Sequence, residues 1–239
     1  MASIVDDRGF NQGFVPTKAL EIRTHRRCDA LIAEMDLSQK REILELGCGT
    51  GELSHLLALK TGANVLGADL CQPFIQEARS KYKASNLNFE TLDLLNVEQV
   101  SALASRFDYI VGNGILHHVY HDLDAVLLKL KALLRPGGKL IFWEPNLLNP
   151  YVQLIFRIPF LRKVAKLEPD EMAFTAKFIS AKLEKAGLTP YLVETRDFLL
   201  PNTPEALIRP VIRLGDVLER HSWLRWSAQS LFISASRPK

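Results

Sequence analysis

The segment that decides the fold reads Ile43-Leu44-Glu45-Leu46-Gly47-Cys48-Gly49-Thr50-Gly51-Glu52-Leu53. Its apolar first part predicts a short buried strand, and the part after the three glycines predicts a helix. Glycines at this spacing allow the backbone to turn sharply and to approach a ligand without a Cβ in the way. The N–H groups at the start of the helix then point toward that ligand. The segment therefore predicts a binding site for a nucleotide or a nucleoside.

Strands and helices alternate around this segment, from residue 41 to residue 144. Because each helix must return the chain to the same edge, this order requires a parallel sheet with helices on both faces. The stretch from Arg135 to Gly138 is expected to stop the last helix and turn the chain into the fifth strand. We expect a doubly wound α/β domain. Strands are predicted over residues 41–46, 64–68, 87–92, 107–111 and 139–143, and helices over residues 52–59, 73–84, 97–105 and 122–134.

The chain outside this region predicts the remaining elements of a single domain. Helices are expected over residues 14–36, 174–186 and 204–220, and strands over residues 191–198 and 230–236. We divide the 239 residues into an N-terminal helical cap (1–40), a cofactor-binding core (41–144), a lid insertion (145–174) and a C-terminal part (175–239).

Composition and charge exclude several classes of protein. A hydrophobic content of 47% with 24% charged residues is typical of a packed globular domain rather than a disordered chain. The three cysteines lack a CxxC spacing, which disfavours a disulfide framework or a zinc site. No secretory signal and no transmembrane run is seen, so we expect a cytoplasmic protein. Residues 1–144 carry 16 basic and 18 acidic side chains and residues 145–239 carry 14 and 9, so we expect the two parts to contact different partners.

The spacing of the glycines distinguishes two kinds of nucleotide site. A dinucleotide fingerprint needs a third glycine where this chain has Glu52, which disfavours a nicotinamide-dependent oxidoreductase. The pattern is instead G-x-G-x-G with Glu45 two residues before it, which resembles motif I of the class I S-adenosylmethionine-dependent methyltransferases. Four later segments resemble the same family in the same order: Asp69 at the end of the second strand, Asp93 after the third, residues 107–119 around the fourth, and Leu-Arg-Pro-Gly-Gly within residues 130–140.

The resemblance implies a Rossmann-like sheet of seven strands, mostly parallel with one antiparallel edge strand, and S-adenosylmethionine as the cofactor. It implies that Asp69 accepts hydrogen bonds from the ribose hydroxyls, that Asp93 holds the adenine amine, and that Leu94 lies against the adenine ring. The full set of expected cofactor contacts is Glu45, Gly47, Cys48, Gly49, Gly51, Asp69, Leu70, Asp93, Leu94 and Asn113.

The resemblance also implies that the sulfonium methyl group is transferred to a nucleophile that the protein positions. His117 and His118 are the ionisable pair beside the expected methyl position, so each is a candidate general base, with His117 favoured. The alternative is that the pair only shapes the pocket. No Asn-Pro-Pro-Tyr tetrad follows the fourth strand, which disfavours methylation of nucleic acids and protein amides. No cluster of Asp and His has the layout of the divalent-ion site of the catechol methyltransferases, so we expect no metal ion.

Recognition of the methyl acceptor is expected outside the core. The apolar insertion favours a small hydrophobic or aromatic acceptor with an O, N or C nucleophile, and no nucleic-acid partner. The insertion is also basic, so a lid, a dimer contact and a contact with an anionic membrane that supplies a lipid or quinone substrate all stay open, as do a monomer and a homodimer. A methyltransferase-like binding protein without activity is a further alternative. The candidate acceptor contacts are Phe14, Arg26, Tyr151 and Phe156, and the basic residues are Arg157, Arg162, Lys163 and Lys166.

Overall fold

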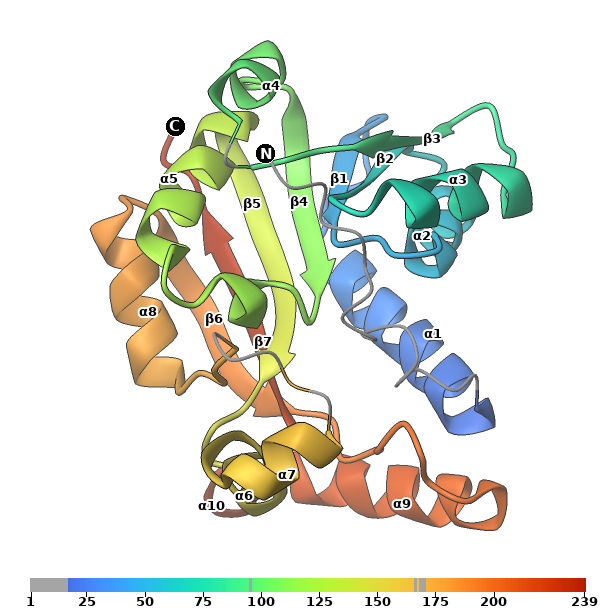
Figure 1. The fold of residues 1–239 in the computed structure, drawn as a ribbon, viewed down its shortest axis with the longest axis vertical. Helices are drawn as coiled ribbons and strands as arrows, with labels where there is room; N and C mark the ends of the chain where they lie inside the picture. The colour runs from blue at the N-terminus through green and yellow to red at the C-terminus, as the bar shows by residue number, and fades with distance from the viewer. Residues whose placement is uncertain (1–16, 95, 166, 168–170) are drawn as a thin grey trace.

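A computed structural model describes residues 17–94, 96–165, 167 and 171–239 of the chain, and its centre is a seven-stranded sheet in the order β3-β2-β1-β4-β5-β7-β6 (Figure 1). Strand β7 pairs antiparallel with both β5 and β6, and the other neighbouring strands pair parallel. The predicted fold class is confirmed, although the antiparallel strand, β7, lies next to the edge strand β6 rather than at the edge itself. The strands are β1 (Glu42–Leu46), β2 (Asn64–Asp69), β3 (Leu87–Thr91), β4 (Phe107–Asn113), β5 (Leu134–Pro145), β6 (Thr189–Arg196) and β7 (Ser230–Ser236).

Helices cover both faces of the sheet. Ile43 packs into a core with α1, α2 and α3, whereas its neighbour Leu44 packs into a second core with α4, α5 and α8 on the opposite face. This is the two-residue alternation that a strand buried on both faces requires. The helices are α1 (Lys18–Ala33), α2 (Glu52–Thr61), α3 (Gln72–Lys81), α4 (Val97–Ala102), α5 (Leu123–Leu133), α6 (Pro150–Arg157), α7 (Pro159–Val164), α8 (Ala176–Lys185), α9 (Glu205–Leu218), α10 (Ser222–Arg225) and the 3-10 helix η2 (Leu116–Val119).

Two parts of the chain differ from the sequence prediction. Strand β5 begins at Leu134, five residues earlier than predicted, because Leu134 pairs with Phe107 and a register shift then absorbs the Pro-Gly-Gly stretch, with Gly137 at φ 80°. The insertion contains α6 and α7, which the sequence analysis did not predict as helices. Each starts with a proline at its first position, where the missing N–H costs nothing. The predicted N-terminal helix is confirmed from Lys18 onward, and its expected start at residues 14–16 lies outside the described residues.

Helices from both ends of the chain gather at one end of the sheet. Strands β4 and β5 end where α1, α6, α7, α9 and α10 gather (Figure 1). Helix α1 is held there by Ala19, which packs with Leu199 and with Ile208 of α9. Ligands of doubly wound sheets bind outside the carboxyl ends of the strands, so this end is where a site is expected. No helix among the described residues is long and apolar enough to cross a membrane.

Candidate functional site

The glycine turn between β1 and α2 has the geometry that the sequence predicts. Gly47, Gly49 and Gly51 all have positive φ, at 64°, 51° and 87°. A Cβ on Gly51 would lie 2.7 Å from the ring of Phe89, whereas a Cβ on Gly49 would meet nothing within 4 Å. The turn therefore packs against Phe89 at Gly51 and is open beside Gly49. This fits a backbone that a ligand approaches.

Asp69 ties the end of β2 to this turn. Its Oδ2 accepts a hydrogen bond from the Gly49 N–H at 2.9 Å, and its Oδ1 accepts one from the Cys71 N–H at 2.9 Å. The carboxylate thus lies beside the open part of the turn, as the ribose assignment requires. Leu70 follows it as an exposed side chain.

Glu45 lies inside the protein rather than on the surface of the turn. Its carboxylate is 2% exposed and accepts a hydrogen bond from the Ser54 hydroxyl of α2. Burial raises the pKa of Glu45 to about 8, although the Ser54 hydrogen bond opposes the shift. Glu45 therefore connects β1 to α2 and positions the glycine turn. Burial likewise raises the pKa of the Cys48 thiol, so Cys48 behaves as a small buried hydrophobe.

Asp93 and Leu94 follow β3 at the same end of the sheet. The Asp93 N–H donates to Gln99 Oε1 at 2.9 Å, which holds the start of the loop against α4. Leu94 packs partly against the core. Both residues follow their strand as Asp69 follows β2, which is the arrangement that an adenosine group lying across these strands needs.

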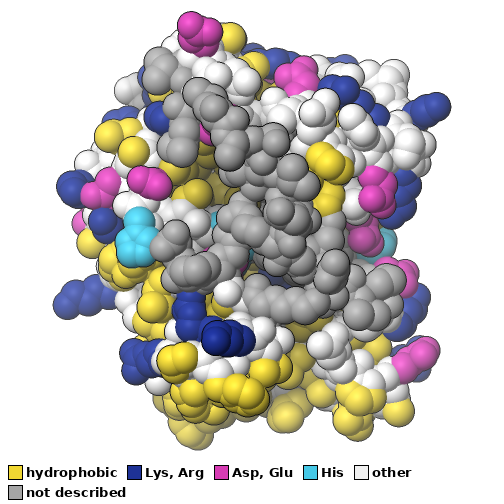
Figure 2. Space-filling model, in the orientation of Figure 1, with side chains coloured by type: hydrophobic (Ala, Val, Ile, Leu, Met, Phe, Trp, Pro, Cys, Tyr) yellow, Lys and Arg dark blue, Asp and Glu magenta, His cyan; other side chains and the backbone are white. Residues whose placement is uncertain are grey.

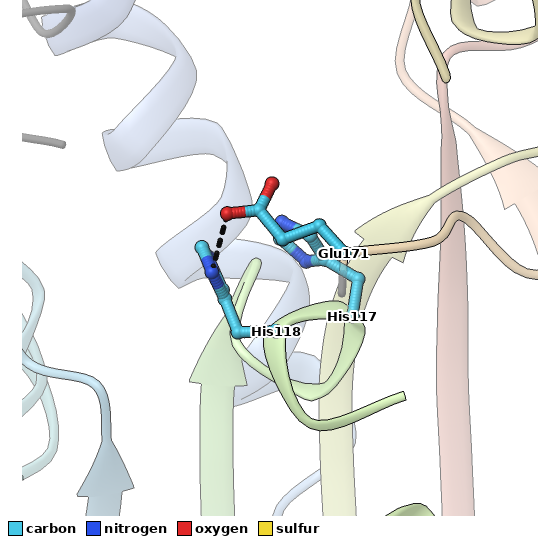
Figure 3. Close-up of side chains that lie close together, drawn as sticks. All are labelled: His117, His118 and Glu171. Atoms are coloured by element: carbon cyan, nitrogen blue, oxygen red, sulfur yellow. Dashed lines mark ion pairs between the residues drawn. The ribbon is translucent and has the colours of Figure 1, made fainter. Parts of the chain in front are cut away.

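Two histidines after β4 each lie beside a buried carboxylate. His117 Nδ1 is 2.9 Å from Glu144 Oε2. His118 Nδ1 is 2.8 Å from Glu171 Oε1, and Figure 3 shows this second pair beside His117. The two imidazole rings have centroids 4.1 Å apart. A carboxylate at Nδ1 favours the tautomer that carries its proton there, which leaves Nε2 of each ring to accept a proton.

Glu144 also fixes the 3-10 helix that carries these histidines. Its carboxylate accepts backbone hydrogen bonds from Ile115 at 3.0 Å and from Leu116 at 2.7 Å, and a longer one from His117. The side chain of Ile115 in turn fills the space beside Gly47, where a Cβ would lie 2.6 Å from it. The histidines are thus placed next to the glycine turn by direct packing. The sequence analysis missed Glu144, although an acidic residue at the end of a strand is the same signal that singled out Asp69.

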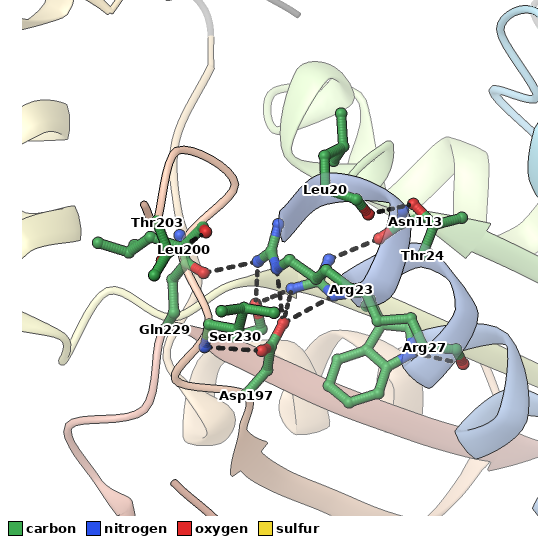
Figure 4. A network of polar contacts seen from close by, with 12 residues as sticks. Leu20, Arg23, Thr24, Arg27, Asn113, Asp197, Leu200, Thr203, Gln229 and Ser230 are labelled. Atoms are coloured by element: carbon green, nitrogen blue, oxygen red, sulfur yellow. Dashed lines mark hydrogen bonds and ion pairs between the residues drawn. The ribbon is translucent and has the colours of Figure 1, made fainter. Parts of the chain in front are cut away.

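A buried ionic network joins α1 to the ends of β4, β6 and β7 (Figure 4). Asp197 Oδ2 accepts hydrogen bonds from Arg23 Nε at 2.7 Å and Arg27 Nε at 2.9 Å. Arg27 also donates to Asn113 Oδ1 at 2.6 Å and to the Ser230 hydroxyl. Burial lowers the pKa of Arg27 to about 10, with Arg23 adding to the effect. Burial alone would raise the pKa of Asp197, but the two guanidinium groups hold it below its ordinary value.

Comparison with known proteins identifies the core. A family profile described as a methyltransferase domain matches residues 44–140, which contain the glycine turn, Asp69, Asp93 and the two histidines. Residues 44–140 are therefore a methyltransferase domain. An S-adenosylmethionine-dependent methyltransferase of Mesorhizobium loti has a similar fold, with a TM-score of 0.63, 23% identity, and coverage of 87% of this chain and 96% of that chain.

Two curated methyltransferases resemble the core of this chain. The ubiquinone biosynthesis O-methyltransferase of Coxiella burnetii is 36% identical over 108 residues, which is 44% of this chain and 44% of that protein. The malonyl-(acyl-carrier protein) O-methyltransferase of Acetivibrio thermocellus is 28% identical over 150 residues, covering 62% of this chain and 50% of that protein. The matches thus span half or less of the length of these relatives.

S-adenosylmethionine is the cofactor of this methyltransferase family, and the site fits it. The backbone beside Gly49 is open, and the Asp69 carboxylate lies next to it, so a hydrogen-bond acceptor for ribose hydroxyls adjoins a backbone that a ligand can approach. Asn113 lies at the end of β4, where Arg27 holds its side chain. The roles of the individual cofactor contacts stay predictions.

The four predicted acceptor contacts of the methyltransferase lie in different places. Phe156 of α6 is buried, and its ring centroid is 6.3 Å from that of His117. Tyr151 is 52% exposed. Arg26 points to the surface, where it pairs with Asp216 of α9 at 2.7 Å, and the structure brings the neighbouring Arg27 inward instead. Phe14 lies outside the described residues.

The expectation that the methyltransferase needs no metal rests on the absence of an Asp–His cluster with the catechol-enzyme layout. The fold brings together a different set of possible ligands, because His117, His118 and Glu171 offer ligand atoms that all lie within 4.8 Å of one another. Glu171 lies in an irregular segment after α7, so spacing along the chain gave no signal for it. The same contacts also suit a proton relay, in which His118 and its carboxylate act together, so metal-free chemistry stays a prediction.

Proposed function

We propose that the chain transfers the methyl group of S-adenosylmethionine to a hydroxyl oxygen of a small apolar acceptor, with His118 as the general base. The observation that carries this proposal is the pair formed by His118 and Glu171 next to the glycine turn. Proton removal is needed most when the nucleophile is a hydroxyl group, because the neutral oxygen is a weak nucleophile. The two curated relatives are both described as O-methyltransferases, which supports the same choice.

His118 is a better candidate than His117, which the sequence analysis favoured. The carboxylate beside His117 belongs to Glu144, which also holds three backbone N–H groups of the η2 turn. The His118 side chain is more exposed than that of His117, and Glu171 comes from the insertion rather than from the sheet. His117 therefore acts as a positioning residue that holds η2, and His118 faces the acceptor side.

When bound, S-adenosylmethionine supplies an electrophilic methyl group, so the protein has to orient the acceptor and remove its proton. Asp69, Asp93 and the glycine turn would hold the cofactor. His118 Nε2 would accept the proton of the acceptor hydroxyl. Glu171 stabilises the imidazolium that results. Phe156 and the apolar residues of α6 exclude water from this step.

Binding and transfer test the proposal separately. Calorimetric titration of the full chain is expected to show binding of S-adenosylhomocysteine and none of NADH. Binding of NADH alone would mean that the glycine turn is misassigned. Transfer of a labelled methyl group to a panel of phenols, hydroxy acids and amines is expected to label the phenols and hydroxy acids. Labelling of amines alone would contradict an oxygen nucleophile.

The base assignment has its own variants. His118→Ala is expected to lower kcat by about 100-fold or more while affinity for S-adenosylhomocysteine is kept. Glu171→Gln keeps the size of the side chain but removes its charge, so it is expected to lower the pKa seen in the pH dependence of kcat. His221→Ala, on an exposed turn, is the matched control. An unchanged kcat in His118→Ala would overturn the role of His118.

A further inference from the structure

The end of the molecule below the sheet carries an apolar surface that we call the end face. It is formed by exposed side chains of α6, α7, α9 and α10, and Figure 2 shows them gathered along the lower end. Phe160 and Trp223 are each 71% exposed, although they come from segments more than 60 positions apart. Single exposed apolar residues are normal on a protein surface, but a continuous patch marks an interaction site. Its largest members are Tyr151, Leu154, Phe160, Leu214, Trp223 and Trp226.

Helix α9 shows how the end face is organised. Ile208 and Gly215 are buried against the protein, while Leu207 and Leu214 point to solvent from a neighbouring side of the helix. The period of 3.6 residues places the exposed Arg209 and Arg213 together on a third side of the helix, and the exposed Arg220 follows in the turn after it. The helix therefore has three sides: one buried in the protein, one apolar and exposed, and one basic. A helix at a membrane interface has an apolar side and a basic side next to each other in this way.

The charge around the end face is mostly positive. Residues 148–165 contain three basic and no acidic side chains, and residues 200–226 contain four basic and three acidic ones. One of these acids, Asp216, is already paired with Arg26. None of the exposed basic residues Arg157, Lys163, Arg209, Arg213 and Arg220 forms an ion pair with any described residue.

We propose that the end face docks on the surface of an anionic lipid bilayer. The aromatic and aliphatic side chains enter the headgroup region, where Trp and Tyr are favoured, and the arginines and lysine pair with lipid phosphates. A second copy of the chain is a poorer partner, because a symmetric contact would bring two basic rims against each other.

Docking at this end would place the acceptor side of the site over the membrane. Helix α6 contributes Tyr151 and Leu154 to the end face, while Phe156 on its inner side approaches the His117 ring. This step rests on the proposed function: a lipid-soluble hydroxyl compound would pass from the bilayer along α6 to His118. Docking itself depends only on the end face.

Vesicle flotation of the full chain tests the docking. Vesicles of phosphatidylcholine with phosphatidylglycerol are expected to carry the protein at low salt, and pure phosphatidylcholine vesicles are expected to carry much less of it. The double variant Phe160→Ser, Trp223→Ser is expected to weaken binding at least about tenfold, the effect of leaving one or two large apolar side chains unburied. Arg209→Glu with Arg213→Glu is expected to remove the dependence on phosphatidylglycerol.

The matched control is the double variant Leu59→Ser, Leu128→Ser. These leucines are 71% and 55% exposed but lie on α2 and α5, away from the end face. The control is expected to bind vesicles like the original chain. Equal binding by all the proteins, or no binding to anionic vesicles, would overturn the proposal. So would a dimer in sedimentation experiments that Phe160→Ser, Trp223→Ser dissociates.

Failure of docking and failure of the proposed function give different results. Phe160→Ser, Trp223→Ser is expected to keep its affinity for S-adenosylhomocysteine and its kcat with a water-soluble acceptor, and to lose activity only with an acceptor presented in vesicles. His118→Ala is expected to bind vesicles normally. Loss of vesicle binding in His118→Ala would show that the docking surface is not the end face alone.

Discussion

The cofactor side and the acceptor side of the site place their functional side chains in different ways. On the cofactor side, the contacts are local: Glu45 and Ser54 are 9 positions apart, and Gly49 and Asp69 are 20 positions apart. On the acceptor side, Arg27 and Ser230 are 203 positions apart, and Arg23 and Asp197 are 174 positions apart. The cofactor side is thus fixed by one strand-turn-helix unit and its neighbour. The acceptor side exists only after both ends of the chain have come together.

The largest expected effect of a single substitution is on the acceptor side, at Asp197. Asp197→Ala leaves Arg23 and Arg27 buried without their shared carboxylate, so it is expected to lower the free energy of unfolding by about 3–5 kcal/mol in urea denaturation. Asp197 also has φ 72°, a conformation that asparagine tolerates. Asp197→Asn therefore serves as the control that keeps the backbone and removes the charge.

The same pair of variants tests whether the two sides are independent. In conditions where Asp197→Asn remains folded, its affinity for S-adenosylhomocysteine is expected to match that of the original chain, because Asp197 contacts Arg23 and Arg27 rather than the glycine turn. A large loss of affinity in the folded variant would show that α1 couples the two sides, through the contact of Arg27 with Asn113.

A second test uses pH, because the buried acids of the two sides have pKa values shifted in opposite directions. The raised pKa of Glu45, about 8, favours its neutral form in the folded protein. Its contribution to stability is therefore complete below the ordinary carboxyl pKa and is lost as the pH rises toward 8, with a slope of up to about 1.4 kcal/mol per pH unit. The lowered pKa of Asp197 acts in the other direction, and its contribution is lost in acid.

Glu45→Gln isolates this effect by mimicking the neutral carboxyl group. Urea denaturation of the cofactor-free protein is expected to give the variant and the original chain similar stability near pH 5, and the variant the higher stability near pH 8. Asp108→Asn removes a carboxylate that forms ion pairs with Arg41 and Arg135, and its pH profile provides the comparison. Parallel pH profiles for Glu45→Gln and the original chain would contradict a protonated Glu45.

The smallest expected effect is on cofactor affinity, at Asp69. Asp69→Ala removes the acceptor of the Gly49 N–H and of the predicted ribose hydroxyls, so calorimetry is expected to show weaker binding of S-adenosylhomocysteine by at least about 1.5 kcal/mol. Asp29→Ala, which breaks a surface ion pair with Lys60, should leave the affinity unchanged. An unchanged affinity in folded Asp69→Ala would refute the assignment.

The difference between local contacts on the cofactor side and long-range contacts on the acceptor side also explains which features the sequence could predict. The sheet order follows from alternating strand and helix patterns, and the glycine turn carries its own signal. Arg27 could have been identified as a buried residue of α1, because it lies four positions after Arg23 and next to Cys28 on the inner side of the helix. Glu171 could not, because its place beside His118 is set by the packing of an irregular segment that has no periodic pattern.

Phe89 has a consequence for how related sequences vary. Its ring fills the space where both Gly51 and Gly67 would carry a Cβ, 2.7 Å and 2.6 Å away, and Gly67 also faces the Ser54 hydroxyl. Gly51 needs its positive φ in any case, but Gly67 is excluded from bearing a side chain only by these two neighbours. Among relatives, an alanine at position 67 should therefore accompany a smaller residue at position 89 and a change at position 54. Substitutions at positions 54, 67 and 89 are therefore expected to occur together, because these side chains share one space.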